Sequence, residues 1–243
     1  TDLRAIGNVT TGTVTVTNAV AITGDHDQLT AALVTAGTKV EVSDAAVTIN
    51  DADATGITAA ELSAIGGSTT GTVTVTNAVA ITGSTAEVTA ALVTAGTLVE
   101  VTDAAVTIND NPTIAELNEI AGKTTGVVTA TLAAASLADL GALNTAGTDA
   151  ITITVNDADA AALTAANLST LGGKTAGTVT VTNAVAITGD HDQLTAALVT
   201  AGTKVVVSDA TVTVNDVDAT AISATELSAI GSATTGTVTV TNA

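Results

Sequence analysis

A repeated phrase constrains the fold more than any other feature. The segment GTVTVTNAVAITG at residues 12–24 returns nearly unchanged at 71–83 and 177–189, and a fourth copy begins at Gly236. The glycines that open successive units alternate between short and long spacings, chiefly 25 and 34 residues, so a full repeat takes about 51–59 residues. Internal periods of this size are typical of solenoids, in which each repeat contacts only its neighbours.

Each half-unit carries the same three parts. Alternation in TVTVT at 13–17 and in KVEVS at 39–43 predicts strands with one buried face. An Asn or Asp corner (TNA, SDA or TDA) follows, and then a second short strand such as AVTIN. The third part is a short helix. The capping box Ser84-Thr85-Ala86-Glu87 marks a helix start, and we expect this helix to end at Gly96. The same device recurs as Thr58 with Glu61, Thr113 with Glu116 and Ser223 with Glu226, and in weaker form as Asp25 with Gln28 and Asp190 with Gln193.

These parts predict a stack of coils. Helices of about two turns do not persist alone, and one coil cannot bury its own apolar face. We therefore predict an α/β solenoid, a right-handed stack of strand–corner–strand–short helix coils with parallel sheets. The stack would be curved, because strands repeat at about 4.8 Å whereas helices pack no closer than about 8–10 Å. Asn and Asp corners would alternate along it.

The predicted domain is a single repeat solenoid over residues 1–243. The segment 126–176 lacks the usual corners, so we expect shorter coils there. Incomplete coils occupy 1–11 and 236–243, and the remaining coils open at Gly12, Gly37, Gly71, Gly96, Gly126, Gly147, Gly177 and Gly202.

Composition limits the chemistry. The chain has no Phe, Trp, Tyr, Met or Cys, yet 46% of its residues are hydrophobic, so the core must be built from Val, Ile, Leu and Ala. Without cysteine there are no disulfides, zinc–thiolate sites or thiol nucleophiles. A net charge of −19 repels phosphate backbones, which predicts no nucleic-acid binding. Every apolar run is shorter than the ~20 residues of a membrane helix, which predicts no membrane insertion.

Oxygen-rich turns recur along the chain. They read NDAD at 50–53, NDN at 109–111, NDAD at 156–159 and NDVD at 215–218. Calcium prefers such carboxylate and carbonyl ligands, whereas Asp and Asn are also ordinary turn residues. Both interpretations stay open. The calcium candidates are Asp51, Asp53, Asp157, Asp159, Asp216 and Asp218.

No catalytic constellation is visible. The only two histidines, His26 and His191, lie six coils apart, about 29 Å at the strand spacing, and so cannot share an ion. We interpret each as a lone exposed side chain beside a helix cap. Nucleophilic catalysis would need a paired base and nucleophile, and the carboxylates recur without one copy standing out. We predict that the chain is not an enzyme.

Rows of outward threonine suggest a further alternative. Thr-x-Thr ladders on flat sheets order water in ice-binding solenoids. Here TVTVT occurs only in alternate coils, and Glu41 and Glu100 place a charge in the intervening ones. We expect the threonine lattice to be broken, so ice binding ranks third among the functions considered.

The repeats resemble a known group of bacterial sequences. The residues TGTVTVTNAVAITG, LTAALVTAGT and VSDAAVTINDADATGITAAELSAIGG are similar to Ala/Thr/Val-rich tandem repeats of giant secreted and cell-surface proteins of cyanobacteria and related bacteria, of hemolysin-like and adhesin-like type. The resemblance covers nearly the whole chain. It implies export, an extracellular or cell-surface location and a structural or adhesive role, while the near-identity of the copies also fits an engineered consensus array.

These observations lead to one expectation and one alternative. Both ends fall inside a repeat, so we expect a segment cut from a longer array, which associates end to end or with further repeats of a longer chain. The expected role is structural and non-catalytic, in an extracellular bacterial surface or filament-forming protein. The alternative is a calcium-responsive adhesion or binding module.

Overall fold

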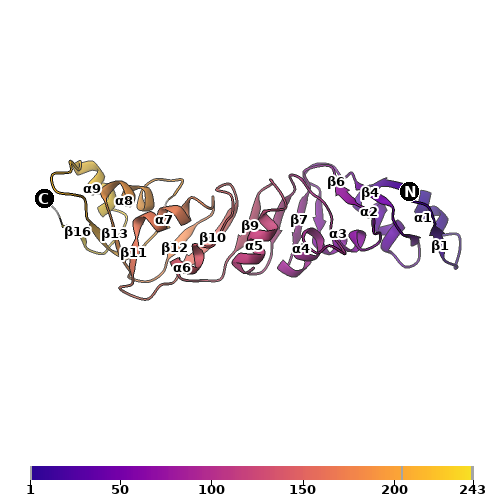
Figure 1. Cartoon of the computed structure of the whole chain (residues 1–243), viewed down its shortest axis with the longest axis horizontal. Coiled ribbons are helices and arrows are strands. Elements are labelled where there is room, and N and C mark those ends of the chain that lie inside the picture. Colours follow the sequence, from indigo (N-terminus) through magenta and orange to yellow (C-terminus); the bar gives the residue numbers. More distant parts are fainter. Residues whose placement is uncertain (1, 204, 242–243) are drawn as a thin grey trace. The chain divides into compact units, whose positions relative to one another are not determined.

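The computed structural model describes residues 2–203 and 205–241 (Figure 1). Lys204 and the corner at Asn242 lie outside the described residues. Contacts between residues divide the described chain into two compact units. Unit 1 comprises residues 2–112 and 116–130, and unit 2 comprises residues 113–115 and 131–241.

Unit 1 alternates short strands with short helices. In chain order its elements are α1 (Asp2–Gly7), β1 (Val14–Val16), β2 (Ala21–Gly24), α2 (His26–Leu29), the π-helical η1 (Thr30–Val34), β3 (Val40–Val42), β4 (Ala46–Ile49), β5 (Gly56–Thr58), α3 (Ala59–Gly66), β6 (Val73–Val75), β7 (Ala80–Gly83), α4 (Thr85–Leu92), β8 (Ala105–Ile108), α5 (Ile114–Ala121) and β9 (Val128–Thr131).

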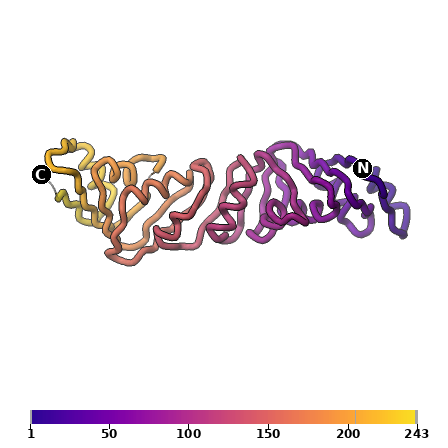
Figure 2. Tube along the Cα trace, in the orientation of Figure 1, coloured from indigo at the N-terminus to yellow at the C-terminus, as the bar shows by residue number. Residues whose placement is uncertain are grey.

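Unit 2 is likewise built of short strands and short helices. Its elements are α6 (Leu137–Leu140), β10 (Ala150–Val155), β11 (Ala162–Thr164), α7 (Ala165–Gly172), β12 (Val179–Val181), β13 (Ala186–Gly189), α8 (His191–Leu198), β14 (Val205–Val206), β15 (Thr211–Val214), α9 (Ala224–Gly231) and β16 (Val238–Val240). Within each unit the Cα trace winds through successive turns of the chain (Figure 2).

The prediction of an α/β fold with parallel sheets is confirmed. In unit 1 the strand orders are β1-β3, β2-β4-β6 and β5-β7-β8-β9, and in unit 2 they are β10-β12-β14 and β11-β13-β15-β16. Each of these pairings is parallel and in register between one coil and the next. Over the described residues no sheet closes into a barrel.

The prediction that every half-unit has two strands was wrong. The long half-unit at 37–70 inserts a third strand, β5, before helix α3. This strand moves the chain one sheet position sideways, so β6 pairs with β4 and β7 pairs with β5. In unit 2, β11 has the same place before α7, and β13 pairs with it. A three-residue strand such as Gly56–Thr58 is too short to show an alternating pattern.

The sideways shift also overturns the expected alternation of corners. Because β6 pairs with β4, the corner residue Asn77 lies alongside Asp51 of the preceding coil. Its Nδ2 donates to the Asp51 carbonyl. Asn77 is therefore not stacked on the corner residue Asp44, as a regular succession of identical coils would require.

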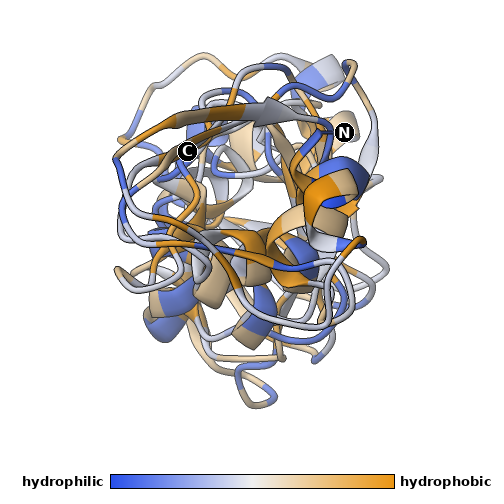
Figure 3. Cartoon of the chain, turned by 90° about the vertical axis from the view of Figure 1, so that its right-hand side faces the viewer, coloured by the Kyte–Doolittle hydropathy of each residue, from blue (hydrophilic) through white to orange (hydrophobic). Residues whose placement is uncertain are grey.

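The core of each unit lies between the strands and the helices. Inward strand residues such as Ile49, Ile57 and Ile81 are fully buried together with the helix residues Leu62 and Leu92. In Figure 3 the helices carry both hydrophobic (orange) and hydrophilic (blue) residues. Full burial of such a side chain contributes about 1.5–3 kcal/mol relative to exposure, so stacking of coils supplies the stability that single coils lack.

The predicted helix starts are largely confirmed. Complete capping boxes begin α3 at Thr58, α4 at Ser84, α8 at Asp190 and α9 at Ser223. The predicted end of α4 at Gly96 was wrong, because the helix stops at Leu92 and Val93 leaves the helical region with φ −121°. The Thr97 hydroxyl then donates to the Ala90 carbonyl, which provides a partner for one of the last carbonyls of the helix.

Two kinds of glycine open the half-units. At Gly71 a Cβ would lie only 2.2 Å from the Ala45 carbonyl oxygen of the preceding coil, and Gly126 is in the same position against Ala104, at 2.3 Å. Thr69 fixes this approach, since its hydroxyl donates to the Ala45 carbonyl at 2.8 Å and accepts from the Gly71 N–H at 3.0 Å. By contrast, a Cβ at Gly96 would meet nothing within 4 Å.

These two environments predict opposite results for one substitution. Gly71→Ala should lower the free energy of unfolding by about 1–3 kcal/mol, because the added methyl pushes the paired coils apart. Gly96→Ala should leave stability unchanged or raise it by about 0.4–1 kcal/mol. Urea unfolding followed by circular dichroism measures both, and equal stability of the two variants would contradict the close approach of the coils.

Candidate functional site

Four aspartates each join the helix of one short half-unit to the following coil. Each carboxylate accepts a hydrogen bond from the backbone N–H of the first helical residue in the preceding coil. The four bonds are His26 to Asp51 at 2.8 Å, Thr85 to Asp110 at 2.7 Å, Leu137 to Asp157 at 2.7 Å and His191 to Asp216 at 2.9 Å. The separations along the chain are 25, 25, 20 and 25 residues.

The inter-coil carboxylate complements the cap that each helix already has. In α2 the N-cap Asp25 accepts from the Gln28 N–H at 2.8 Å, while Asp51 takes the N–H of His26. The first N–H groups of a helix have no partner inside it, and the positive end of the helix dipole at this terminus favours a negative charge. The second carboxylate therefore stabilises the helix and attaches it to the next coil with the same bond.

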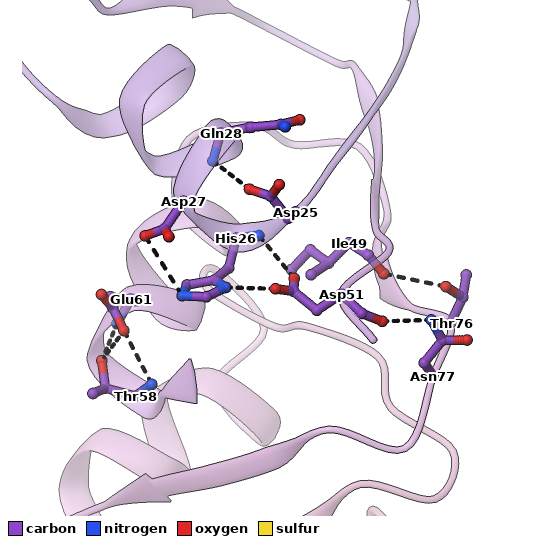
Figure 4. A network of polar contacts seen from close by, with 10 residues as sticks. All are labelled: Asp25, His26, Asp27, Gln28, Ile49, Asp51, Thr58, Glu61, Thr76 and Asn77. Atoms are coloured by element: carbon purple, nitrogen blue, oxygen red, sulfur yellow. Dashed lines mark hydrogen bonds and ion pairs between the residues drawn. The ribbon is translucent and has the colours of Figure 1, made fainter. Parts of the chain in front are cut away.

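Asp51 contacts the coils on both sides of its own (Figure 4). Its carboxylate reaches back to His26, and its backbone carbonyl accepts from Asn77 Nδ2 in the coil that follows. In unit 2, Asp157 repeats this arrangement with Leu137 behind it and Asn183 Nδ2 ahead, the latter at 2.6 Å. One buried turn residue thus ties three successive coils together.

The second aspartate of each turn faces the other way. Asp53 Oδ1 accepts from the Ala78 N–H of the following coil at 3.1 Å, and Asp159 does the same for Ala184 at 3.2 Å. The equivalent position ahead of Asp218 is residue 243, which lies outside the described residues. The two carboxylates of one turn therefore serve opposite neighbours.

The three turns that contain two aspartates share an unusual backbone conformation. The residue after the second aspartate has a positive φ at Ala54, Ala160 and Ala219, with values of 60°, 59° and 64°. This left-handed conformation costs a residue with a side chain about 1–2 kcal/mol. In two of the turns this residue also donates to the next coil, Ala54 to Ala78 O and Ala160 to Ala184 O, both at 2.8 Å.

The structure therefore does not bring the calcium candidates of one turn together around a common point. Asp51 contacts His26 whereas Asp53 contacts Ala78, and in unit 2 Asp157 and Asp159 divide between Leu137 and Ala184 in the same way. Asp216 contacts His191. Within the residues that the structure describes, no group of three or more His, Asp or Glu side chains is arranged to hold a metal ion. Calcium binding by these turns stays a prediction.

The interpretation of the histidines as lone and exposed was wrong. The side chains of His26 and His191 are only 14% and 15% exposed. His26 Nδ1 lies 2.7 Å from Asp51 Oδ1, and His191 Nδ1 lies 2.6 Å from Asp216 Oδ1. The signal missed in the sequence is the recurrence of Asp 25 residues after each histidine.

The surrounding carboxylates change the titration of these groups. Burial alone would lower the pKa of His26, but the hydrogen bond and charge of Asp51, with Asp27 and Glu61, outweigh burial and raise it. The hydrogen bond to Asp216 raises the pKa of His191, with smaller contributions from Asp192 and Glu226. Burial would raise the pKa of Asp216, yet its hydrogen bonds from His191 hold it below the ordinary value.

The threonine rows are broken in one place and continuous in another. Thr15 pairs with Glu41, and Thr74 pairs with Glu100, so these rows contain a charge as expected. The sideways shift of the strands, however, creates uninterrupted rows, which are Thr58–Thr82–Thr107–Thr129 in unit 1 and Thr164–Thr188–Thr213–Thr239 in unit 2. In unit 1 the adjacent row of Gly56, Ala80 and Ala105 carries no hydroxyl, so ice binding keeps its third rank.

A groove of about 420 Å³ lies in unit 2 between α6 and α7. Residues of α6, β11 and α7 line it, together with Asp157 and Lys174. Its charged side chains are already engaged with α6: Asp157 accepts from the Leu137 N–H, and Lys174 Nζ donates to the carbonyls of Gly141 and Leu143. The groove therefore belongs to the joint between two coils.

No protein-family model, curated protein or solved structure matches the chain. Over residues 2–203 and 205–241, no helix combines the length and the apolar character that crossing a bilayer requires.

The inter-coil cap leads to a direct test by substitution. Asp51→Ala should lower the free energy of unfolding by about 1–3 kcal/mol, because it leaves the N–H of His26 without its acceptor. Asp44→Ala removes the same charge from an exposed corner whose carboxylate accepts from the adjacent Ser43, and should change stability by less than about 0.5 kcal/mol. Thermal melting at pH 7 compares the two, and equal losses would contradict a special role for Asp51.

Proposed function

We propose that the chain is a structural, non-catalytic repeat segment of an extracellular bacterial surface or filament-forming protein. Its task would be to provide length and rigidity. The observation that carries this proposal is the use of its polar side chains: the recurring Asp, Asn and Thr residues bond to the coil before or after their own. A chain whose recurring polar side chains bond to neighbouring coils is suited to a structural role.

The proposed architecture is a single α/β solenoid over residues 1–243, right-handed and curved. Its support is the in-register parallel pairing of each coil with the next inside both units, at offsets close to one half-unit. Further repeats of a longer parent chain would extend the same pairing, and self-association would use it between chains. The extracellular location rests on the resemblance of the repeats to secreted and cell-surface proteins.

A solenoid can lose a whole repeat and still fold. Excision of residues 12–70 joins Thr11 to Gly71 and restores the Thr-Thr-Gly sequence found at 10–12 and 69–71. The shortened chain should keep its circular dichroism spectrum and melt cooperatively with a reduced enthalpy, because stability in such arrays is a sum over neighbouring repeats. Calorimetry measures both quantities.

The matched control removes residues 37–83, which leaves helix α4 without the strands on which it packs. This variant should lose its cooperative transition. Failure of both variants would contradict the solenoid, as expected if the chain were one globular core in which every segment supports the others.

The calcium-responsive module makes a different prediction. A site with a dissociation constant of about 0.1 mM would stabilise the protein by about 1.4 kcal/mol at 1 mM calcium. The structural proposal expects no change in melting temperature when 1 mM calcium replaces 1 mM magnesium. A rise that disappears in the Asp53→Asn and Asp159→Asn variants would favour the calcium module instead.

A further inference from the structure

We propose that His26 and His191 are acid-strengthened latches, in which protonation of the imidazole tightens the attachment of a helix to the following coil. This device goes beyond the structural role of the segment. It makes the cohesion of the coils depend on pH between weakly acidic and weakly basic conditions.

The geometry fixes where the proton goes. An ionised carboxylate only accepts hydrogen bonds, so the short contacts with Asp51 and Asp216 place a hydrogen on Nδ1 of each histidine. The nitrogen that titrates is then Nε2. It lies 3.6 Å from Asp27 Oδ1 in the first latch and 3.5 Å from Asp192 Oδ1 in the second. Protonation therefore creates a positive charge between two carboxylates.

The groups that face each imidazole come from three elements. For His26 they are Asp27 beside it in the chain, Asp51 after β4, and Glu61 of α3 (Figure 4). For His191 they are Asp192, Asp216 after β15, and Glu226 of α9. The N-terminal end of a helix disfavours a positive charge, and the carboxylates around both histidines outweigh that effect.

The sign of the pH dependence follows from these surroundings. The pKa of each histidine is higher in the folded chain than its ordinary value of 6.5, so the folded state binds the proton more tightly than the unfolded state. The contribution of the latch is complete below about pH 6.5 and is lost as the pH rises through the folded pKa. On the acid side, Asp216 loses its contribution only as the pH falls below the ordinary carboxyl range, because its pKa is lowered.

The chain contains its own control for this proposal. Thr85 has the same place as the histidines, and its N–H and hydroxyl both donate to Asp110, at 2.7 and 2.5 Å. A threonine thus makes the same inter-coil attachment without a group that titrates near neutrality. The double variant His26→Thr/His191→Thr keeps the attachment and removes the titrating group. The variant Thr85→His/Ala86→Asp adds a third latch, since it supplies both the imidazole and the carboxylate that faces Nε2.

The test compares the melting temperatures of the wild type and these two variants between pH 6 and pH 8. A net charge of −19 makes the whole chain more stable as the pH falls, and this background is common to all three proteins. The advantage of the wild type over the double variant should shrink by about 2–4 °C between pH 6 and pH 8. The melting temperature of Thr85→His/Ala86→Asp should fall further than that of the wild type over the same range.

NMR titration of the imidazole carbons gives a second measurement, and its first result requires only the wild-type protein. Both histidines should titrate above the ordinary value of about 6.5, and each should move to lower pH when Asp27→Asn or Asp192→Asn removes the carboxylate facing its Nε2. If the melting temperatures of the wild type and the double variant changed equally with pH, the latch proposal would be overturned. Histidines that titrate at or below the ordinary value would overturn it as well.

Discussion

The parallel, in-register pairing of each coil with the next is the constraint on which the other contacts depend. The strands have two to six residues and the helices four to eight, so neither would persist alone. A slip of one residue would turn every inward Val and Ile outward. Register is held by the Thr-Thr-Gly openings, where Thr69 and Thr124 bond to the preceding coil and the following glycine allows the backbones to approach.

The composition follows from this pairing. A coil made of two or three short strands and a two-turn helix encloses little space, which Val, Ile, Leu and Ala fill without aromatic residues. The remaining backbone groups at corners and helix ends need partners, and the Asp, Asn and Thr side chains of the next coil supply them. Asp51 and Asp157 do this for two neighbours at once.

The same frame lets a single residue change the character of a joint. Equivalent positions hold His26, Thr85, Leu137 and His191, each with its N–H bound to an aspartate of the following coil. The backbone bond is constant and the side chain is variable, so the attachment is kept whichever residue is present. Only the histidines bring a charge that depends on pH, because their titrating nitrogen faces Asp27 or Asp192.

Local patterns alone predicted the alternating strands, the capping boxes at Thr58, Ser84 and Ser223, and the parallel α/β class. They did so because period-two alternation and a cap depend on residues within one short segment. The extra strand β5, the end of α4 at Leu92, the continuous threonine rows and the partners of His26 and His191 were decided by the tertiary structure. Each of these depends on which residue of the next coil lies alongside. A strand of only three residues, β5, shifts that pairing and is too short to show an alternating pattern in the sequence.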